Sequence, residues 1–140
     1  MPPNVFISHA SENAAIAERL VHFLELNGVP CWIVPRDVVP GQEYLEALAS
    51  AIDDCAVFLI LFSVNAAESV HVQNEIERAA AQGKPIILVR LDQTDITVNR
   101  GLHLLLARHH WLDASQGALE DYLEAISEAT RVLYNQNIDK

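Results

Sequence analysis

Glu75 is the residue whose type and position best suit chemistry. Apolar residues around it, among them Val72 and Ile76, recur with helical spacing and predict a helix with one buried face. A step of about 100° per residue places Glu75 about 60° from Val72, at the rim of that face, where a carboxylate is partly desolvated and still reaches a ligand. The alternative is a surface carboxylate that pairs with Arg78. His71 lies one turn earlier on the same stripe, either as a ligand contact or as a solvated first-turn residue.

The turn after the first apolar run, 5–7, supplies a second group of candidate positions. Ser8, His9 and Ala10 lead into Ser11, whose hydroxyl is predicted to cap the following helix. The free N–H groups at the start of a helix are suited to phosphate binding, so these residues are candidates for a substrate contact. Simple helix capping is the alternative.

Arg36 is the only basic residue in the segment 35–41, whose two prolines and one glycine predict a loop. Its guanidinium is interpreted as a contact for a pyrophosphate or for the acidic surface of a neighbouring subunit, with a loose surface charge as the alternative. Asp37 is either part of the same site or a cap for the loop. Trp32, on the strand before the loop, either packs in the core or stacks on a nucleobase.

Strand and helix signals alternate along the chain. Apolar runs predict five strands, at 5–7, 31–34, 56–62, 86–89 and 109–112. Short connections through helices favour right-handed crossovers and a parallel sheet, so we expect an α/β, flavodoxin-like three-layer fold with strand order 2-1-3-4-5. Ligands in such sheets bind beyond the carboxyl ends of the strands where the order reverses, here between strands one and three. The candidate site is therefore built from residues 8–11 and 63–69, beginning with Ser63.

The helices and the chain ends carry further expectations. The second helix is expected to bury a face made by Leu45, Leu48, Ala49 and Ile52. Residues 63–69 are expected to form a polar loop, and 101–107 a short helix. The single domain is expected to span 1–134, with a frayed polar tail at 135–140.

Composition limits the function. The 140 residues are 51% apolar, which suits one compact domain with a proper core. The 19 acidic and 9 basic side chains give a formal net charge of −10, which excludes non-specific nucleic-acid binding and disfavours an anionic membrane surface. The N-terminus lacks the pattern of a signal peptide, and the longest apolar run, 56–62, is far shorter than the ~20 residues that cross a bilayer. We expect a cytoplasmic location, with Cys31 and Cys55 as buried reduced thiols.

Motifs of other sheet chemistries are missing. The turn after the first strand has no glycine, so neither a dinucleotide-binding G-x-G-x-x-G nor a P-loop is present. Strands one and three end in Ser8 and Ser63, not in the acidic residues of a phosphoacceptor domain. The adjacent His109 and His110 point to opposite faces of a strand, and no H-E-x-x-H is present. We predict no metal site.

Five groups of residues, in this order and each on the expected element, resemble those of Toll/interleukin receptor (TIR) domains. They are 5–9, 31–41, 56–65, 71–75, and 83–87 together with 110–113. The resemblance covers roughly residues 4–130. The proline-rich segment 35–41 occupies the position of the family's BB loop and looks most like that of TIR modules from bacterial defence proteins.

Many TIR domains of that type hydrolyse or cyclise NAD⁺. The resemblance implies that Glu75 is the catalytic carboxylate, which stabilises the oxocarbenium-like ribose as neutral nicotinamide departs. Substrate contacts are then expected from Ser8, His9, Ala10, Trp32, Arg36, Asp37, Ser63 and His71. Many catalytic relatives place a tryptophan where this chain has His71, which has less aromatic surface.

The same resemblance implies that the domain needs no cofactor and acts only after self-assembly through the BB loop. A fused or separate sensor domain and a role in antiphage signalling are implied as well. The product is ADP-ribose or a cyclic isomer of it. The alternative is a non-enzymatic module that passes signals by contact between TIR domains.

Overall fold

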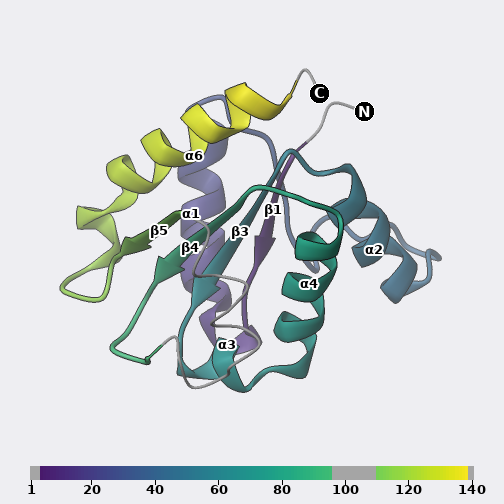
Figure 1. Ribbon diagram of the computed structural model, residues 1–140, viewed down its shortest axis with the longest axis horizontal. Coiled ribbons are helices and arrows are strands. Elements are labelled where there is room, and N and C mark those ends of the chain that lie inside the picture. Colours follow the sequence, from purple (N-terminus) through teal and green to yellow (C-terminus); the bar gives the residue numbers. More distant parts are fainter. Residues whose placement is uncertain (1–3, 96–109, 139–140) are drawn as a thin grey trace.

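A parallel five-stranded sheet with strand order β2-β1-β3-β4-β5 forms the centre of the molecule (Figure 1). The computed structural model describes residues 4–95 and 110–138. The strands are β1 (Val5–Ser8), β2 (Cys31–Trp32), β3 (Val57–Phe62), β4 (Ile86–Arg90) and β5 (His110–Asp113). The predicted sheet and its strand order are confirmed. His109 and the helix expected at 101–107 lie outside the described residues.

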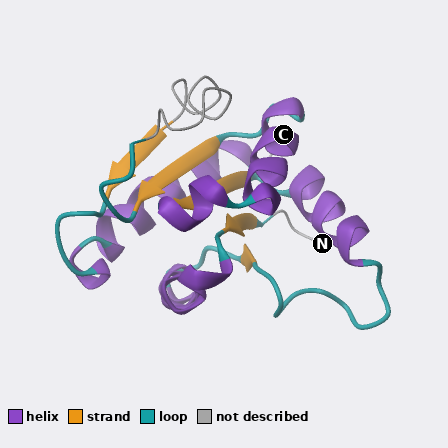
Figure 2. Cartoon of the chain, turned by 90° about the horizontal axis from the view of Figure 1, so that it is seen from below, coloured by secondary structure: helices purple, strands orange, loops and turns teal. Residues whose placement is uncertain are grey.

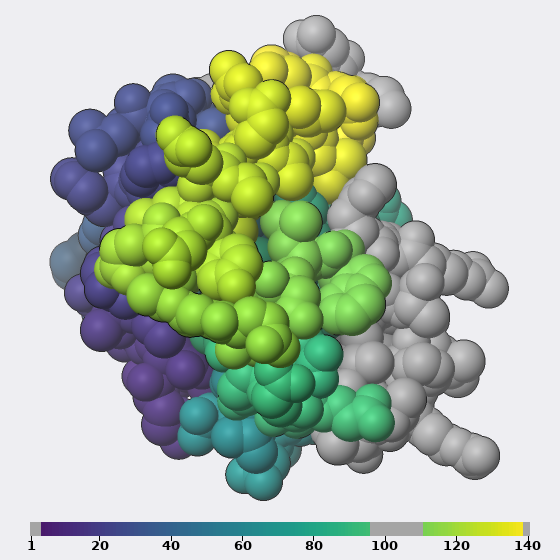
Figure 3. Space-filling model, turned by 90° about the vertical axis from the view of Figure 1, so that its left-hand side faces the viewer, coloured from purple at the N-terminus to yellow at the C-terminus, as the bar shows by residue number. Residues whose placement is uncertain are grey.

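Helices cover both faces of the sheet and give the expected three layers (Figure 2). On one face lie α1 (Ala14–Leu26) and α6 (Leu123–Asn137), and on the other lie α2 (Tyr44–Asp54) and α4 (Val70–Ala81). The short helix α3 (Val64–Glu68) and the 3₁₀ turns η1 (Ser11–Asn13) and η3 (Leu119–Asp121) complete the connections. Figure 3 looks onto the side of the molecule where α6 lies across its upper part.

Strand alternation divides the core into two halves. Val5 and Ile7 of β1 pack toward α1 and α6, whereas Phe6 packs toward α2 and α4. Phe6 stacks on Trp32 and on Phe58, with ring centroids 5.2 and 5.3 Å apart. The central strand β3 is buried at all its positions because helices cover both of its faces.

The buried face of α2 differs from the prediction. Leu45 is 63% exposed, whereas Ala47, Leu48 and Ile52 are buried. Leu45 lies in the first turn, directly after the N-cap Glu43, whose carboxylate accepts hydrogen bonds from the backbone N–H groups of Leu45 and Glu46. The helix packs on the sheet only from its next turn onward.

Two predicted irregular segments are helical. Residues 63–69 were expected to be a loop but hold α3, because the Ser63 hydroxyl accepts from the Ala66 N–H and caps the helix. The last helix continues to Asn137, past the expected start of the tail, because Tyr134 is buried and the Asn137 amide donates to the Leu133 carbonyl. No helix in the described ranges is long and apolar enough to cross a membrane.

The predicted cap at Ser11 is wrong. Its hydroxyl donates to Glu12, and Ser11 opens the short turn η1, which has no side-chain cap. The helix α1 begins only at Ala14. The cysteines Cys31 and Cys55 are both buried and free, as expected, and burial is the main cause that raises their pKa values to about 12 and about 11.

Candidate functional site

Glu75 and Ser8 meet at the carboxyl end of β1. Ser8 is the last residue of that strand and pairs in register with Ile60 of β3. Since Phe6 faces α4, the alternation of β1 turns Ser8 to the same side, where its hydroxyl donates a 2.7 Å hydrogen bond to Oε1 of Glu75. The contact lies between strands one and three, where the strand order reverses and where the sequence predicted the site.

The Glu75 carboxylate is partly buried, and this changes its chemistry. Desolvation raises its pKa from 4.5 to about 7, while the hydrogen bond from Ser8 opposes the rise. A carboxyl group tuned in this way, at the ligand-binding edge of a sheet, is a candidate for catalysis. The alternative pairing with Arg78 is excluded, because Arg78 forms a two-bonded fork of 2.9 and 2.6 Å with Asp53.

Tyr44 is the residue that the sequence analysis missed. It is the first residue of α2, whose start lies at the same end of the molecule as the start of α4 (Figure 1). Its pKa is raised, first by desolvation and then by the negative charge of Glu75, so the two side chains are within electrostatic reach. Tyr44 as a whole is 48% exposed, so it offers an accessible aromatic side chain within reach of the Glu75 charge. The sequence signal for Tyr44 is an aromatic residue at the start of the helix that follows the candidate loop 35–41.

His9 does not join this group, and Ala10 lies on the Glu75 side of the sheet with its side chain buried. Burial lowers the pKa of His9, and the nearby charge is Glu18 of α1, on the opposite face of the sheet from α4. Within the described part of the chain, Nδ1 of His9 is buried and has no hydrogen-bond partner. Ala10 is buried in the core between the sheet and α2 and α4.

The ring of Trp32 packs on the core, whereas His71 is exposed near Glu75. Trp32 stacks on Phe6 at an interplanar angle of 14°, so its ring packs on the core as one of its two interpretations predicted. His71 lies in the first turn of α4 and is exposed, one helical turn from Glu75. His71 therefore supplies only part of the aromatic surface that was expected one turn before Glu75.

Ser63 has two structural roles. Besides capping α3, its hydroxyl donates a 2.7 Å hydrogen bond to Oδ1 of Asn13, at the start of α1. Ser63 is 2% exposed, so its polar group must be satisfied inside the protein.

We therefore expect Ser63→Ala to lower the free energy of unfolding by about 1–2 kcal/mol, because it removes a helix cap and leaves the partly buried amide oxygen of Asn13 without its donor. Urea denaturation followed by circular dichroism measures the change. Ser50→Ala, at an exposed serine of α2, is the control. Equal midpoints for the two variants would contradict the structural role of Ser63.

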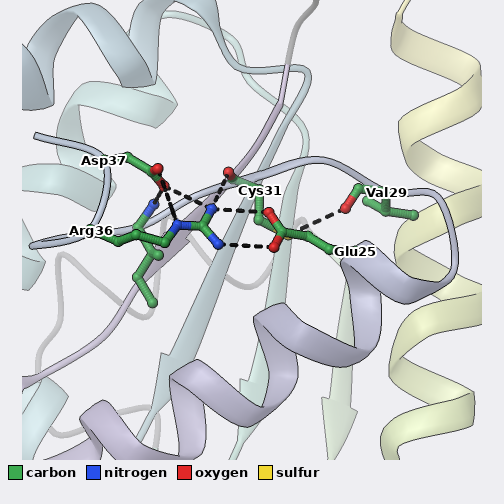
Figure 4. Close-up of polar contacts among 6 residues, drawn as sticks. Glu25, Val29, Cys31, Arg36 and Asp37 are labelled. Carbon is green, nitrogen blue, oxygen red and sulfur yellow. Dashed lines mark hydrogen bonds and ion pairs between the residues drawn. The ribbon is translucent and has the colours of Figure 1, made fainter.

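Arg36 and Asp37 form a group away from Glu75. The Arg36 guanidinium binds both carboxylate oxygens of Glu25, near the end of α1 (Figure 4). Asp37 accepts from Arg36 and from the backbone N–H of Ile33. Since α1 and α4 cover opposite faces of the sheet, the structure separates this pair from the carboxylate of Glu75.

The surface also carries a hollow of about 490 Å³ between β5 and α6, and Glu75 does not line it. Its walls are mostly apolar and include Trp111, Leu112, Val132 and Leu133. Among residues 4–95 and 110–138, no cluster of three or more histidine, cysteine or acidic side chains could hold a metal ion.

Comparisons with known proteins agree with the fold. A family model described as the TIR domain matches residues 5–130. The TIR domain of the Toll-related receptor TRR-2 from Hydra magnipapillata is 18% identical, with a TM-score of 0.73 over 92% of this chain and 96% of that one. The TIR domains of the activated Roq1 resistosome, which recognises the effector XopQ, are 16% identical, with a TM-score of 0.62 over 95% and 84%.

The CMP N-glycosidase BcmB of Clostridium botulinum is 25% identical, with a TM-score of 0.62 over 90% of this chain and 98% of that one. No curated protein sequence matches the chain significantly. The two TIR structures, at lower identity, bear on the fold alone, whereas the family model matches the sequence itself over most of its length. The chain belongs to the TIR domain family.

Proposed function

We propose that this TIR domain cleaves the bond between nicotinamide and ribose in NAD⁺, with Glu75 as the catalytic carboxylate. The observation that carries the proposal is the partly buried Glu75, held by Ser8 at the carboxyl edge of the sheet. A fixed negative charge in a partly desolvated site stabilises positive charge far better than one in water does. No cofactor is needed for this reaction.

The proposed reaction begins with heterolytic cleavage of the bond between ribose C1′ and the nicotinamide nitrogen. The electron pair stays with the nitrogen, so nicotinamide leaves as a neutral molecule that needs no general acid. Positive charge then develops on C1′ and the ring oxygen, where the Glu75 carboxylate stabilises it. Water adds to C1′ and loses one proton to give ADP-ribose, or a nucleophilic atom of the same molecule adds to give a cyclic product.

Tyr44 and His71 are the side chains available to position the substrate beside Glu75. Tyr44 is partly exposed, and His71 lies one turn from the carboxylate. Their rings can cover the nicotinamide, as aromatic side chains do for planar ligands. We propose that assembly of several TIR domains through the loop 35–41 completes the site, and that the protein acts in cytoplasmic antiphage signalling under a sensor domain. The TIR domains of the activated Roq1 resistosome are an example of such domains within an assembly.

A second candidate is cleavage of a nucleoside monophosphate. The similarity to the CMP N-glycosidase favours it, because that enzyme's name describes cleavage of an N-glycosidic bond to ribose as well. The two candidates differ in the base that leaves. Release of cytosine from CMP, with NAD⁺ untouched, would replace the first proposal by the second.

The decisive experiment is chromatographic analysis of products after the chain is clustered, for example through an oligomeric fusion, and incubated with NAD⁺ or CMP in parallel. We expect nicotinamide to appear from NAD⁺. If no base is released from either compound by clustered protein, the domain is a non-enzymatic module for TIR–TIR contact.

Ser8→Ala tests how the carboxylate is tuned. Because Glu75 acts in its ionised form and its pKa is about 7, the rate of cleavage should be low in acid and reach a plateau above neutral pH. The Ser8 bond lowers that pKa, so its removal should move the rising limb of the pH–rate profile to higher pH. Initial rates between pH 5 and pH 9 measure the shift. An unchanged limb would show that the hydrogen bond does not tune the carboxylate.

A further inference from the structure

The loop after β2 is fastened at its base by a network centred on Arg36 (Figure 4). The guanidinium forms a fork with Glu25: Nη1 donates to Oε1 at 2.8 Å, and Nη2 donates to Oε2 at 2.9 Å. Nη2 also donates to the carbonyl oxygen of Cys31 at 2.9 Å, and Nε donates to both carboxylate oxygens of Asp37 at 3.1 Å. Its three nitrogens are therefore all engaged within the chain.

Asp37 fixes the start of the loop through two hydrogen bonds to the backbone of Ile33. Its Oδ2 accepts from the backbone N–H of Ile33 at 2.9 Å, and its own N–H donates to the Ile33 carbonyl at 3.0 Å. Two charged side chains thus tie the end of strand β2, the first turn of the loop and the last turn of α1 together. Glu25 is the penultimate residue of that helix.

The exposure of the ion pair does not make the network weak. The side chains of Arg36 and Glu25 are 45% and 38% exposed, and an isolated pair of this kind contributes little. Here the geometry is bidentate, and the same guanidinium also binds a backbone carbonyl and a second carboxylate. Such forks are stronger and more directional than single ion pairs.

Beyond this base the loop exposes apolar side chains. Val39 is 60% exposed, and Leu45, where α2 begins, is 63% exposed. The charged network thus fixes the start of the loop and leaves an apolar tip facing outward. An ordered tip loses less conformational entropy when a partner binds than a mobile one does.

We propose that Arg36 is a positioning residue, not a substrate ligand: its fork with Glu25 holds the base of the loop 33–41 and thereby presents the tip at Val39 to a second copy of the chain. The positioning rests on the geometry alone. The role of the second copy rests on the proposed function, in which assembly completes the site. Arg36→Lys keeps the charge but cannot form the fork.

Hydrogen exchange tests the positioning without any need for catalysis. In dilute wild-type protein, the amides of Ile33, Asp37 and Val38 are hydrogen-bonded within the loop. We expect roughly tenfold faster exchange of these amides in Arg36→Ala, Arg36→Lys and Glu25→Gln, because each substitution removes the charged fork. Glu128→Gln, which breaks an exposed pair with Arg131 on α6, is the matched control. Exchange as slow as in the wild type in all three loop variants would overturn the proposal, whether or not the protein is an enzyme.

Kinetics then separate a positioning role from a ligand role. We expect Arg36→Ala and Glu25→Gln each to raise the protein concentration needed for half-maximal NAD⁺ cleavage several-fold, without changing the KM for NAD⁺ once assembly is saturated. The double variant should show no further change, because both residues act through one fork. A raised KM in Arg36→Ala, with wild-type behaviour in Glu25→Gln, would mean that Arg36 binds the substrate, and the proposal would be wrong.

Discussion

Glu75→Gln is expected to lower the rate of nicotinamide release from NAD⁺ by at least roughly 10²–10³-fold, the loss typical when one preorganised electrostatic contact to a transition state is removed. The amide has nearly the same shape, and its oxygen still accepts a hydrogen bond from Ser8, so the arrangement of the site should persist. Only the negative charge beside the ribose is lost. Initial rates with clustered protein, measured by chromatography at pH 8, test this expectation.

Glu77→Gln provides the matched control, because Glu77 lies on the same helix, α4, and is exposed. It removes an equal charge from the protein without touching the site. We expect its rate to stay within about twofold of the wild-type rate, as for other exposed substitutions. Equal loss in both variants would show that overall charge matters and that Glu75 has no special part. Full activity of Glu75→Gln would disprove its catalytic role.

The fold was predictable because its signals are local and regular. The five apolar runs and the helical spacing between them determine the alternation of strands and helices. Because crossover connections between parallel strands are right-handed, few sheet topologies then remain. The position of Glu75 at the rim of a helix face followed from the same periodicity. Its hydrogen bond to Ser8, and the pairing of Arg78 with Asp53, show that tertiary contacts decided between the alternatives. Local patterns could not reveal that Asp53, on another helix, takes Arg78 as its partner.

The polar contacts were predicted less well because they depend on residues far apart in the chain. Ser8 reaches across 67 positions to Glu75, and Ser63 reaches across 50 to Asn13. The prediction of a substrate contact at His9, in the turn after β1, did not consider to which face of the sheet this side chain points. Strand alternation alone already separates Ser8 from His9, since neighbouring side chains point to opposite sides of a sheet. Applying that rule one residue beyond the strand would have kept His9 apart from Glu75.

Glu75→Gln should also make the protein more stable, and increasingly so as the pH rises. The folded-state pKa of about 7 lies above the ordinary 4.5, so the folded chain holds this proton more tightly than the unfolded chain does. At low pH both states are protonated and the carboxyl group costs nothing. Between about pH 4.5 and pH 7 the unfolded state ionises first, and the wild type loses up to about 3 kcal/mol of stability, a loss that stays constant at higher pH.

Glutamine does not ionise, so the difference in unfolding free energy between Glu75→Gln and the wild type should grow by about 3 kcal/mol from pH 4.5 to pH 8. Urea denaturation at several pH values measures it. Asp53→Asn is a control of opposite sign, because the bond from Arg78 lowers the pKa of Asp53, and its stabilising contribution is present at neutral pH and lost in acid. A difference for Glu75→Gln that does not change with pH would mean that the carboxyl group ionises as it does in water.

These two expectations for one substitution reinforce each other. A charged side chain that costs the fold several kcal/mol at neutral pH has no structural reason to be where it is, since an amide of the same shape would serve the packing and the Ser8 hydrogen bond equally well. Preorganised sites commonly carry such a cost, because the charge that destabilises the empty protein is the charge that a cationic transition state requires. A variant that is both more stable and inactive would identify Glu75 as functional. If the variant is more stable and fully active, the stability lost to the Glu75 charge serves no catalytic role.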